Sequence, residues 1–222
     1  SPGDEWVGLS GRARVVAYNT DHVDPDHDLP DSILDFTNEE WRGRIGWAPT
    51  NGSFQAFVTA LRVVEGDAAA LEWLEGIRDN DPTVYPNNST TLEGVATGEV
   101  DVGFVNHYYL FRNLAEAGEG YGARNYYLKD GDAGALVNIA GAAVLDESSN
   151  VDTAHEFIAY MLSESAQQYF ADETFEYPLI DGIDTDSRLT PLDELNPPDI
   201  DLGDLDSLSE TLDMLREANV LP

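Results

Sequence analysis

Short apolar runs that suit β-strands alternate along this chain with amphipathic segments of helical length. The runs at 44–47, 83–85 and 100–105 are each followed within a few residues by a helical pattern. This alternation is typical of α/β folds, in which helices cover a mainly parallel sheet. Ligands of such sheets bind beyond the carboxyl ends of the strands, where helices begin. The chain is therefore expected to be an α/β protein with its binding site at strand-to-helix junctions.

The two ends of the chain carry further signals of secondary structure. Residues 5–9 and 12–18 have the composition of two strands, and the Ser-Gly pair at 10–11 predicts a turn between them. Near the other end, Ser207 precedes Glu210 by three residues. That spacing predicts a capping box at the start of a last helix.

The charge of the chain excludes some functions and favours an unusual environment. There are 43 acidic against 11 basic residues, for a net charge of −32, and Lys129 is the single lysine. Binding of nucleic acid needs a basic face and is not expected. So acidic a surface, with almost no lysine, indicates adaptation to high salt, where charge repulsion is screened. The lack of cysteine excludes disulfides and thiolate metal sites.

Three strand-to-helix junctions are rich in uncharged polar groups. They are Asn-Gly-Ser at 51–53, Asn-Asn-Ser at 87–89 and Asn-His-Tyr-Tyr at 106–109. Free backbone N–H groups at a helix start, beside a glycine and a hydroxyl, suit an anion. The same residues also serve as ordinary helix N-caps. The sequence leaves both interpretations open at the first two junctions.

The third junction contains two adjacent tyrosines, Tyr108 and Tyr109. A phenol has a pKa of about 10 and is normally neutral. Ferric iron replaces that proton because it prefers anionic oxygen ligands, and tyrosinate is one of its protein ligands. The positive end of a helix dipole also favours phenolate. The alternative is that one ring belongs to the core and the other to its rim; His107, between Asn106 and the pair, is expected to face solvent.

Two arginines stand close together in a chain with few bases. Arg12 and Arg14 alternate with apolar residues, so both are expected on one face of a strand. They either bind an anion or pair with surface carboxylates. No Gly-x-Ser-x-Gly, phosphate-loop or His-Glu-x-x-His pattern occurs, and we do not expect an enzyme.

Several motifs occur together in the order and approximate spacing of one family. On these motifs the chain resembles, over residues 5–183, the ferric-iron-binding solute receptors of ABC importers, a bacterial transferrin-like family. The low lysine content favours a haloarchaeal member. The motifs are Trp6-Val7-Gly8-Leu9-Ser10-Gly11-Arg12, Trp47-Ala48-Pro49-Thr50-Asn51-Gly52-Ser53-Phe54, Tyr85-Pro86-Asn87-Asn88-Ser89, Gly98-Glu99-Val100-Asp101-Val102-Gly103, Asn106-His107-Tyr108-Tyr109 and Glu176-Tyr177-Pro178-Leu179.

The resemblance implies a fold and a division of the chain. The fold is a two-lobe, periplasmic-binding-protein-like (type II) α/β fold with mixed, mainly parallel sheets. The family's chain begins well upstream of Trp6, so the first lobe is expected to be incomplete. The expected parts are a partial first lobe at 1–14 and 139–190, a second lobe at 15–138 and 191–222, and hinge strands near 14–18 and 136–142.

The resemblance also implies roles for individual residues. Tyr108 and Tyr109 match two tyrosinate ligands of ferric iron, although a third tyrosine that some members have near 52–54 is absent. A synergistic anion, phosphate or carbonate, would be held by a larger set of residues. That set is Arg12, Asn51, Gly52, Ser53, Asn88 and Asn106.

A transport function follows from the same resemblance. The protein would be an extracytoplasmic receptor that delivers iron to an ABC permease. It would be held at the membrane through an N-terminal lipid anchor that the 222 residues lack. An alternative is that the same scaffold binds an organic anion or amine, such as a phosphonate or polyamine, without iron.

Overall fold

The computed structural model describes residues 6–221, which form two compact units. Unit 1 is the chain through Arg12 together with Val137–Glu194, and unit 2 is Ala13–Leu136 together with the chain from Leu195. These boundaries fall within a few residues of the expected lobe boundaries. That the units are lobes moving about a hinge stays a prediction. No helix within residues 6–221 is long and apolar enough to cross a membrane.

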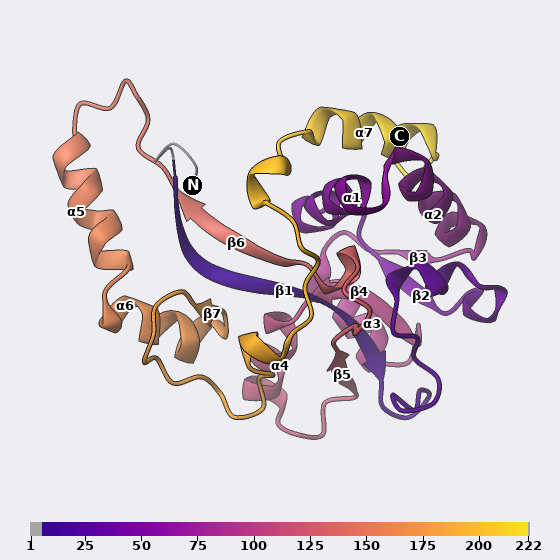
Figure 1. Ribbon diagram of the computed structural model, residues 1–222. Coiled ribbons are helices and arrows are strands. Elements are labelled where there is room, and N and C mark those ends of the chain that lie inside the picture. The colour runs from indigo at the N-terminus through magenta and orange to yellow at the C-terminus, as the bar shows by residue number, and fades with distance from the viewer. Residues whose placement is uncertain (1–5, 222) are drawn as a thin grey trace. The chain divides into compact units, whose positions relative to one another are not determined.

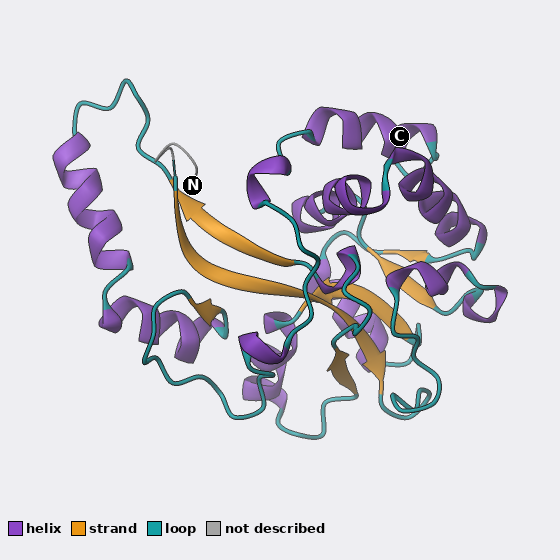
Figure 2. Cartoon of the chain, viewed as in Figure 1, coloured by secondary structure: helices purple, strands orange, loops and turns teal. Residues whose placement is uncertain are grey.

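Unit 2 contains a mixed five-stranded sheet (Figures 1 and 2). The strands β3 (Thr83–Val84), β2 (Ile45–Trp47) and β4 (Val102–Asn106) run parallel to one another. The long strand β1 (Val7–Asn19) pairs antiparallel with β4 and with β5 (Ala123–Tyr126). The prediction of a mixed sheet is confirmed, but its parallel part is limited to β3, β2 and β4.

Strand β1 is continuous where the sequence predicted a turn at 10–11. Ser10 and Gly11 pair with Pro178 and Tyr177 of the two-residue strand β7 (Tyr177–Pro178). A Cβ atom on Gly11 would lie 3.2 Å from Cβ of Tyr177. The glycine therefore permits a close strand pairing instead of a turn, which is its other common role in strands.

Helices cover both faces of the sheet in unit 2. One face carries α1 (Gly52–Glu65), α2 (Asp67–Asp79) and α7 (Leu208–Glu217), and the other carries α3 (Asn88–Ala96) and α4 (Tyr108–Ala117). Alternate residues of a strand point to opposite faces. Accordingly, Val16 and Phe104 belong to a cluster with α1 and α2, whereas Val15 and Val105 belong to a second cluster with α3 and α4.

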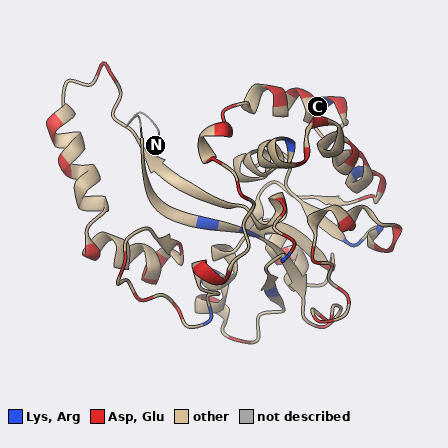
Figure 3. Ribbon diagram, viewed as in Figure 1, with Lys and Arg blue, Asp and Glu red and all other residues tan. Residues whose placement is uncertain are grey.

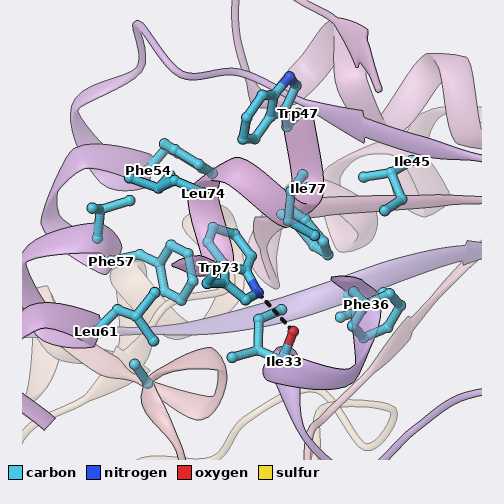
Figure 4. Close-up of a cluster of buried hydrophobic side chains, with 14 of the residues drawn as sticks. Ile33, Phe36, Ile45, Trp47, Phe54, Phe57, Leu61, Trp73, Leu74 and Ile77 are labelled. Atoms are coloured by element: carbon cyan, nitrogen blue, oxygen red, sulfur yellow. Dashed lines mark hydrogen bonds between the residues drawn. The ribbon is translucent and has the colours of Figure 1, made fainter. Parts of the chain in front are cut away.

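The first cluster is built around aromatic side chains (Figure 4). The rings of Phe57 and Trp73 meet edge to face, with centroids 5.3 Å apart. The indole N–H of Trp73 donates to the carbonyl of Ile33, with the two atoms 2.9 Å apart. Ile33 begins a short 3₁₀ turn, Ile33–Thr37, and the side chain of Ser32 caps it by accepting from the N–H of Leu34. Other 3₁₀ turns of unit 2 are Glu39–Trp41, Ala133–Ala135 and Leu202–Asp204.

Two glycines bring helix α3 close to the parallel strands. A Cβ atom on Gly46 of β2 would lie 2.9 Å from the ring of Tyr85, and one on Gly103 of β4 would lie 2.8 Å from Thr91 of α3. The two glycines are partners in the β2–β4 register. The absence of side chains at this pair therefore fixes how near the start of α3 lies to the sheet.

The capping box predicted for the last helix is wrong. Ser207 stands at the N-cap of α7, but its side chain makes no cap hydrogen bond. Its carbonyl and hydroxyl oxygens instead accept from Nη1 of Arg62, at 3.0 and 3.3 Å. The long-range contact with α1 displaces the local one.

Unit 1 buries fewer side chains than unit 2. Its part of β1 pairs with β6 (Val137–Ala142) and with β7. Its helices are α5 (Val151–Met161), α6 (Glu164–Tyr169) with a π-helical turn at Phe170–Thr174, and a 3₁₀ turn at Leu192–Glu194. Helix α5 has no buried residue. The side chain of Gln167, by contrast, is fully buried.

Candidate functional site

The three polar junctions lie at one edge of the unit 2 sheet. Strands β3, β2 and β4 are neighbours and parallel, so their carboxyl ends meet at the same edge. Helices α3, α1 and α4 begin directly after them. Three helix N-termini, each with a partial positive charge, are thus collected beside one another.

The first two junctions are joined by hydrogen bonds between their side chains. Oδ1 of Asn51 accepts from the backbone N–H of Ser53 at 2.9 Å and from its hydroxyl at 2.6 Å. Nδ2 of Asn88 donates to the same Ser53 hydroxyl oxygen at 3.0 Å. Asn51 is therefore a true N-cap of α1, while Ser53 and Asn88 connect the starts of α1 and α3.

Two features leave this network able to take a ligand. Apart from its two chain neighbours and the nearby backbone of its own helix, no atom of residues 6–221 lies within 4 Å of the Cβ position of Gly52, so the helix start is open there. Asn88 is 1% exposed, and its Oδ1 is buried without a hydrogen-bond partner among the residues that the structure describes. A buried polar atom without a partner is costly, and a bound group that donates to it would remove that cost.

The tyrosine pair opens helix α4. The rings of Tyr108 and Tyr109 are stacked, with centroids 4.4 Å apart and planes inclined by 28°. Tyr108 is buried and Tyr109 is half-buried. Sequence neighbours on a helix usually diverge, but these two phenols lie together.

His107 is buried, and the prediction that it faces solvent is wrong. The ring nitrogen Nδ1 of His107 accepts from the backbone N–H of Ala13 at 3.1 Å. The backbone N–H of His107 donates to the carbonyl of Ala13 at 3.0 Å. Its carbonyl accepts from Nδ2 of Asn125 at 2.8 Å. Asn125, on β5, was missed because nothing in the apolar pattern of that strand distinguishes it.

Asn106 ends β4 and shares a face of the sheet with Arg14. The two residues are direct partners in the antiparallel β1–β4 register, and such partners point to the same side. The guanidinium of Arg14 lies over the rings of Phe54 and Phe57, at 5.5 and 5.0 Å from their centroids. Both rings belong to α1. The side chain of Asn106 is therefore on the sheet face that α1 covers.

One interpretation of the sequence was that Arg14 pairs with surface carboxylates, and the structure shows that it is buried instead. Nη2 of Arg14 donates to the carbonyl of Phe104 at 3.0 Å, while its Nη1 has no hydrogen-bond partner within residues 6–221. This burial lowers the pKa of Arg14 to about 9. Arg12 belongs to unit 1, where it is half-buried, and its Nε is buried with no hydrogen-bond partner in the described part of the chain.

Comparison with known proteins identifies close relatives. The chain is 35% identical over 217 residues to the major ferric iron-binding protein of Neisseria meningitidis, covering 97% of this chain and 65% of that protein. It is also 35% identical to the Fe(3+)-binding periplasmic protein of Serratia marcescens, covering 97% and 64%. The chain thus spans less than two thirds of the length of these relatives.

Solved structures agree with the sequence comparison. The crystal structure of iron-bound HitA from Pseudomonas aeruginosa superposes with a TM-score of 0.90 at 38% identity, covering 96% of this chain and 69% of that one. A Trichodesmium protein in complex with iron and citrate superposes with a TM-score of 0.86 at 25% identity, covering 98% and 71%. The expected periplasmic-binding-protein-like α/β fold is confirmed.

The family itself is defined over most of the chain. The model of the family described as bacterial extracellular solute-binding protein matches residues 1–201. This family consists of transport proteins that bind solutes and not of enzymes, in agreement with the motif analysis. The chain belongs to the bacterial extracellular solute-binding proteins.

Proposed function

We propose that the protein is a solute receptor that binds ferric iron together with a synergistic anion. The observation that carries this proposal is the stacked pair Tyr108 and Tyr109 at a helix start, on the sheet edge where Asn51, Ser53 and Asn88 form their network. Two phenolates and an anion would neutralise the charge of Fe(III). Relatives named for ferric iron support the choice of cargo.

Each part of the proposed site has a separate task. Tyr108 and Tyr109 would ligate the metal through their phenolate oxygens, which a ferric ion favours. The anion, phosphate or carbonate, would lie at the open start of α1 at Gly52 and would accept hydrogen bonds from the side chains around it. Those side chains are Asn51, Ser53, Asn88, Asn106 and, from unit 1, Arg12. In the singly protonated form of the anion, its O–H would donate to Oδ1 of Asn88.

The proposal extends to the place and partner of the receptor. Units 1 and 2 would be the two lobes, with the hinge near 14–18 and 136–142, and the receptor would deliver iron to an ABC permease outside the cytoplasm. A lipid anchor would hold it at the membrane. Membership of an extracellular solute-binding family supports this location.

The test is a ferric citrate titration followed by visible absorbance. The unsubstituted chain should develop a tyrosinate-to-iron charge-transfer band. Tyr108→Phe should abolish or strongly weaken the band, because it removes a phenolate. Tyr160→Phe, at an exposed ring of α5 in unit 1, is the matched control and should leave the band unchanged.

Two outcomes would contradict the proposal. An unchanged band in Tyr108→Phe would overturn the assignment of the site. A chain without any band, but with heat of binding for a phosphonate or polyamine in calorimetry, would favour the alternative solute class. Repeating the titration in carbonate, phosphate and citrate buffers identifies the synergistic anion.

We further propose that the receptor is adapted to high salt and is haloarchaeal. Acidic residues are spread over helices and loops, whereas basic residues are few (Figure 3). Raising salt from 0.1 to 1 M shortens the screening length from about 10 Å to about 3 Å. The midpoint of thermal unfolding should therefore rise with KCl over this range. A midpoint that falls would contradict the adaptation.

A further inference from the structure

We propose that His107 is a positioning residue that ties strand β1 to the start of helix α4 and thereby sets the geometry of the tyrosine pair. This inference rests on the proposed iron-binding function. It concerns a residue that binds neither metal nor anion in that proposal. The contact consists of a ring nitrogen of His107 and the backbone amide of Ala13, both in unit 2.

This tie, the hydrogen bond from the Ala13 amide to Nδ1 of His107, replaces a backbone hydrogen bond of the β-ladder that is lost where helix α4 begins. In an antiparallel ladder, hydrogen-bonded partners exchange two N–H to carbonyl bonds. The β1–β4 register ends at Arg14 and Asn106, so Ala13 and His107 would be the next partners. One bond of that pair is present, from the N–H of His107 to the carbonyl of Ala13.

The second bond of the pair is not available from the backbone. His107 has φ −57° and ψ −41°, which are helical values. Its carbonyl accepts from Asn125. The N–H of Ala13 therefore donates to Nδ1 of the His107 ring. A side chain thus extends the sheet by one residue into the helix, and Nδ1 must be unprotonated to accept.

The tie lies directly beside the proposed metal ligands. The imidazole is fully buried, and its ring meets the ring of Tyr108 edge to face, with centroids 5.7 Å apart and planes at 90°. It also contacts the ring of Phe111, one turn further along α4, at 6.3 Å between centroids. A shift of the imidazole would therefore act directly on the ring of Tyr108.

The tie also lies at the boundary between the units. Ala13 is the first residue of unit 2 on β1 and follows Arg12, the last residue of that segment in unit 1. The next amide, of Arg14, donates at 2.8 Å to the carbonyl of Leu136, the residue before the chain returns to unit 1. Both crossings of the chain are thus fixed within two residues of the His107 contact. A rearrangement of β1 at Ala13 would reach the tyrosine pair through the two hydrogen bonds that join Ala13 and His107.

Two substitutions of His107 that are similar in shape distinguish the effect of losing the hydrogen-bond acceptor from the effect of losing the ring's volume. His107→Asn places an oxygen near the position of Nδ1, whereas His107→Leu offers no acceptor. Loss of one buried hydrogen bond corresponds to about a tenfold change in an equilibrium or rate. We expect iron to leave His107→Leu about tenfold faster, with a shifted charge-transfer maximum, and His107→Asn to resemble the unsubstituted chain.

The experiment records the band, the rate of iron release to a chelator and the hydrogen exchange of the Ala13 amide. His155→Leu, on the exposed helix α5, is the matched control. A purely structural role would lower the unfolding midpoint of His107→Leu without moving the band. If His107→Leu does not fold, Asn125→Leu decides, because it removes the donor to the His107 carbonyl and should shift the band in the same direction.

The outcomes distinguish this inference from the proposed function. A shifted band and faster release in His107→Leu, restored in His107→Asn, supports the positioning role. A normal band and release rate in His107→Leu, or equal defects in the two variants, overturns it while the iron function stands. An unsubstituted chain without any band overturns the proposed function, and the positioning role with it.

Discussion

The two units of the molecule are stabilised in different ways. Unit 2 encloses an aromatic core that includes Phe57 and Trp73, both essentially inaccessible to solvent. Unit 1 has no comparable cluster among its described residues. Its helix α5 exposes Phe157 and Tyr160, by 60% and 57%.

Polar contacts take the place of a core in unit 1. The buried amide of Gln167 donates to the carbonyls of Leu9 and Met161 at 2.7 and 2.9 Å, and it accepts from the N–H of Leu179 at 2.7 Å. One side chain thus holds β1, the end of α5 and the segment after β7. Ser10 likewise donates from its hydroxyl to the carboxylate of Glu176.

The difference bears on function. The residues of the candidate site, apart from Arg12, lie on the densely packed unit, where packing holds side chains in one geometry. Regions with few buried apolar contacts open at lower free energy than the core. Unit 1 is therefore expected to unfold first, while unit 2 keeps the tyrosine pair in its folded geometry.

The largest effect should come from the aromatic core. Trp73→Ala removes a buried indole and its hydrogen bond to Ile33, and it should lower the free energy of unfolding by about 3–5 kcal/mol. Phe157→Ala, at an exposed phenyl ring in unit 1, should change it by less than about 0.5 kcal/mol. The measurement is urea unfolding of both variants followed by circular dichroism, which gives the two losses in free energy of unfolding. Tryptophan fluorescence can also follow the unfolding of Phe157→Ala, which keeps Trp73. Equal losses would mean that α5 is covered in solution.

A smaller and more local effect is expected at Gln167. Gln167→Leu leaves two buried carbonyls and one amide without their partner, at a cost of about 1–3 kcal/mol. The loss should appear as faster hydrogen exchange at Leu179, with little change in unit 2. Gln168→Leu is the control, because its hydrogen bonds to Asp172 and Asp184 are exposed and water replaces them. Uniform acceleration in both units would show that they unfold together.

The order of elements and the place of the site were predictable from the sequence. Period and turn signals gave strands β2, β3 and β4 and the helices after them, and the rule for parallel sheets then selected one edge. Asn51 and Asn87 cap α1 and α3, which was one of the two interpretations of these junctions, since their short side chains accept hydrogen bonds from the backbone a few residues on. These features depend on local chemistry, which a single sequence contains.

The failures all involve partners that are distant in the sequence. Gly11 looked like a turn until its partner Tyr177 was known. His107 looked solvated because its acceptor role depends on Ala13, which lies 94 residues earlier. Arg14 was expected to bind an anion or to pair with surface carboxylates, but its guanidinium lies over the rings of Phe54 and Phe57. A single sequence shows neither strand pairing nor the burial of a charge, so these outcomes were not predictable.

The smallest effect concerns one ion pair of unit 1 and depends on pH. Asp186 accepts from Nε and Nη2 of Arg188 at 2.9 and 2.6 Å and from the Arg188 N–H at 2.9 Å. The side-chain hydrogen bond from Arg188 is the main cause that holds the pKa of Asp186 below its ordinary value of 3.8. The pKa of Asp186 is thus lower in the folded than in the unfolded protein. The ion pair therefore stabilises the fold at pH values above the unfolded pKa, and this stabilisation is lost as the pH falls through the folded pKa.

Asp186→Asn should therefore destabilise unit 1 only at the higher pH values. Near neutral pH the loss should stay below about 1 kcal/mol, since the pair is partly exposed and solvent screens it. Hydrogen exchange at Leu189 reports on it, because that amide donates to the carbonyl of Asp186. Glu156→Gln on α5 is the charge-matched control. The difference between Asp186→Asn and the unsubstituted chain should vanish once the pH lies below the folded pKa, and a difference that persists there would assign the effect to packing instead of charge.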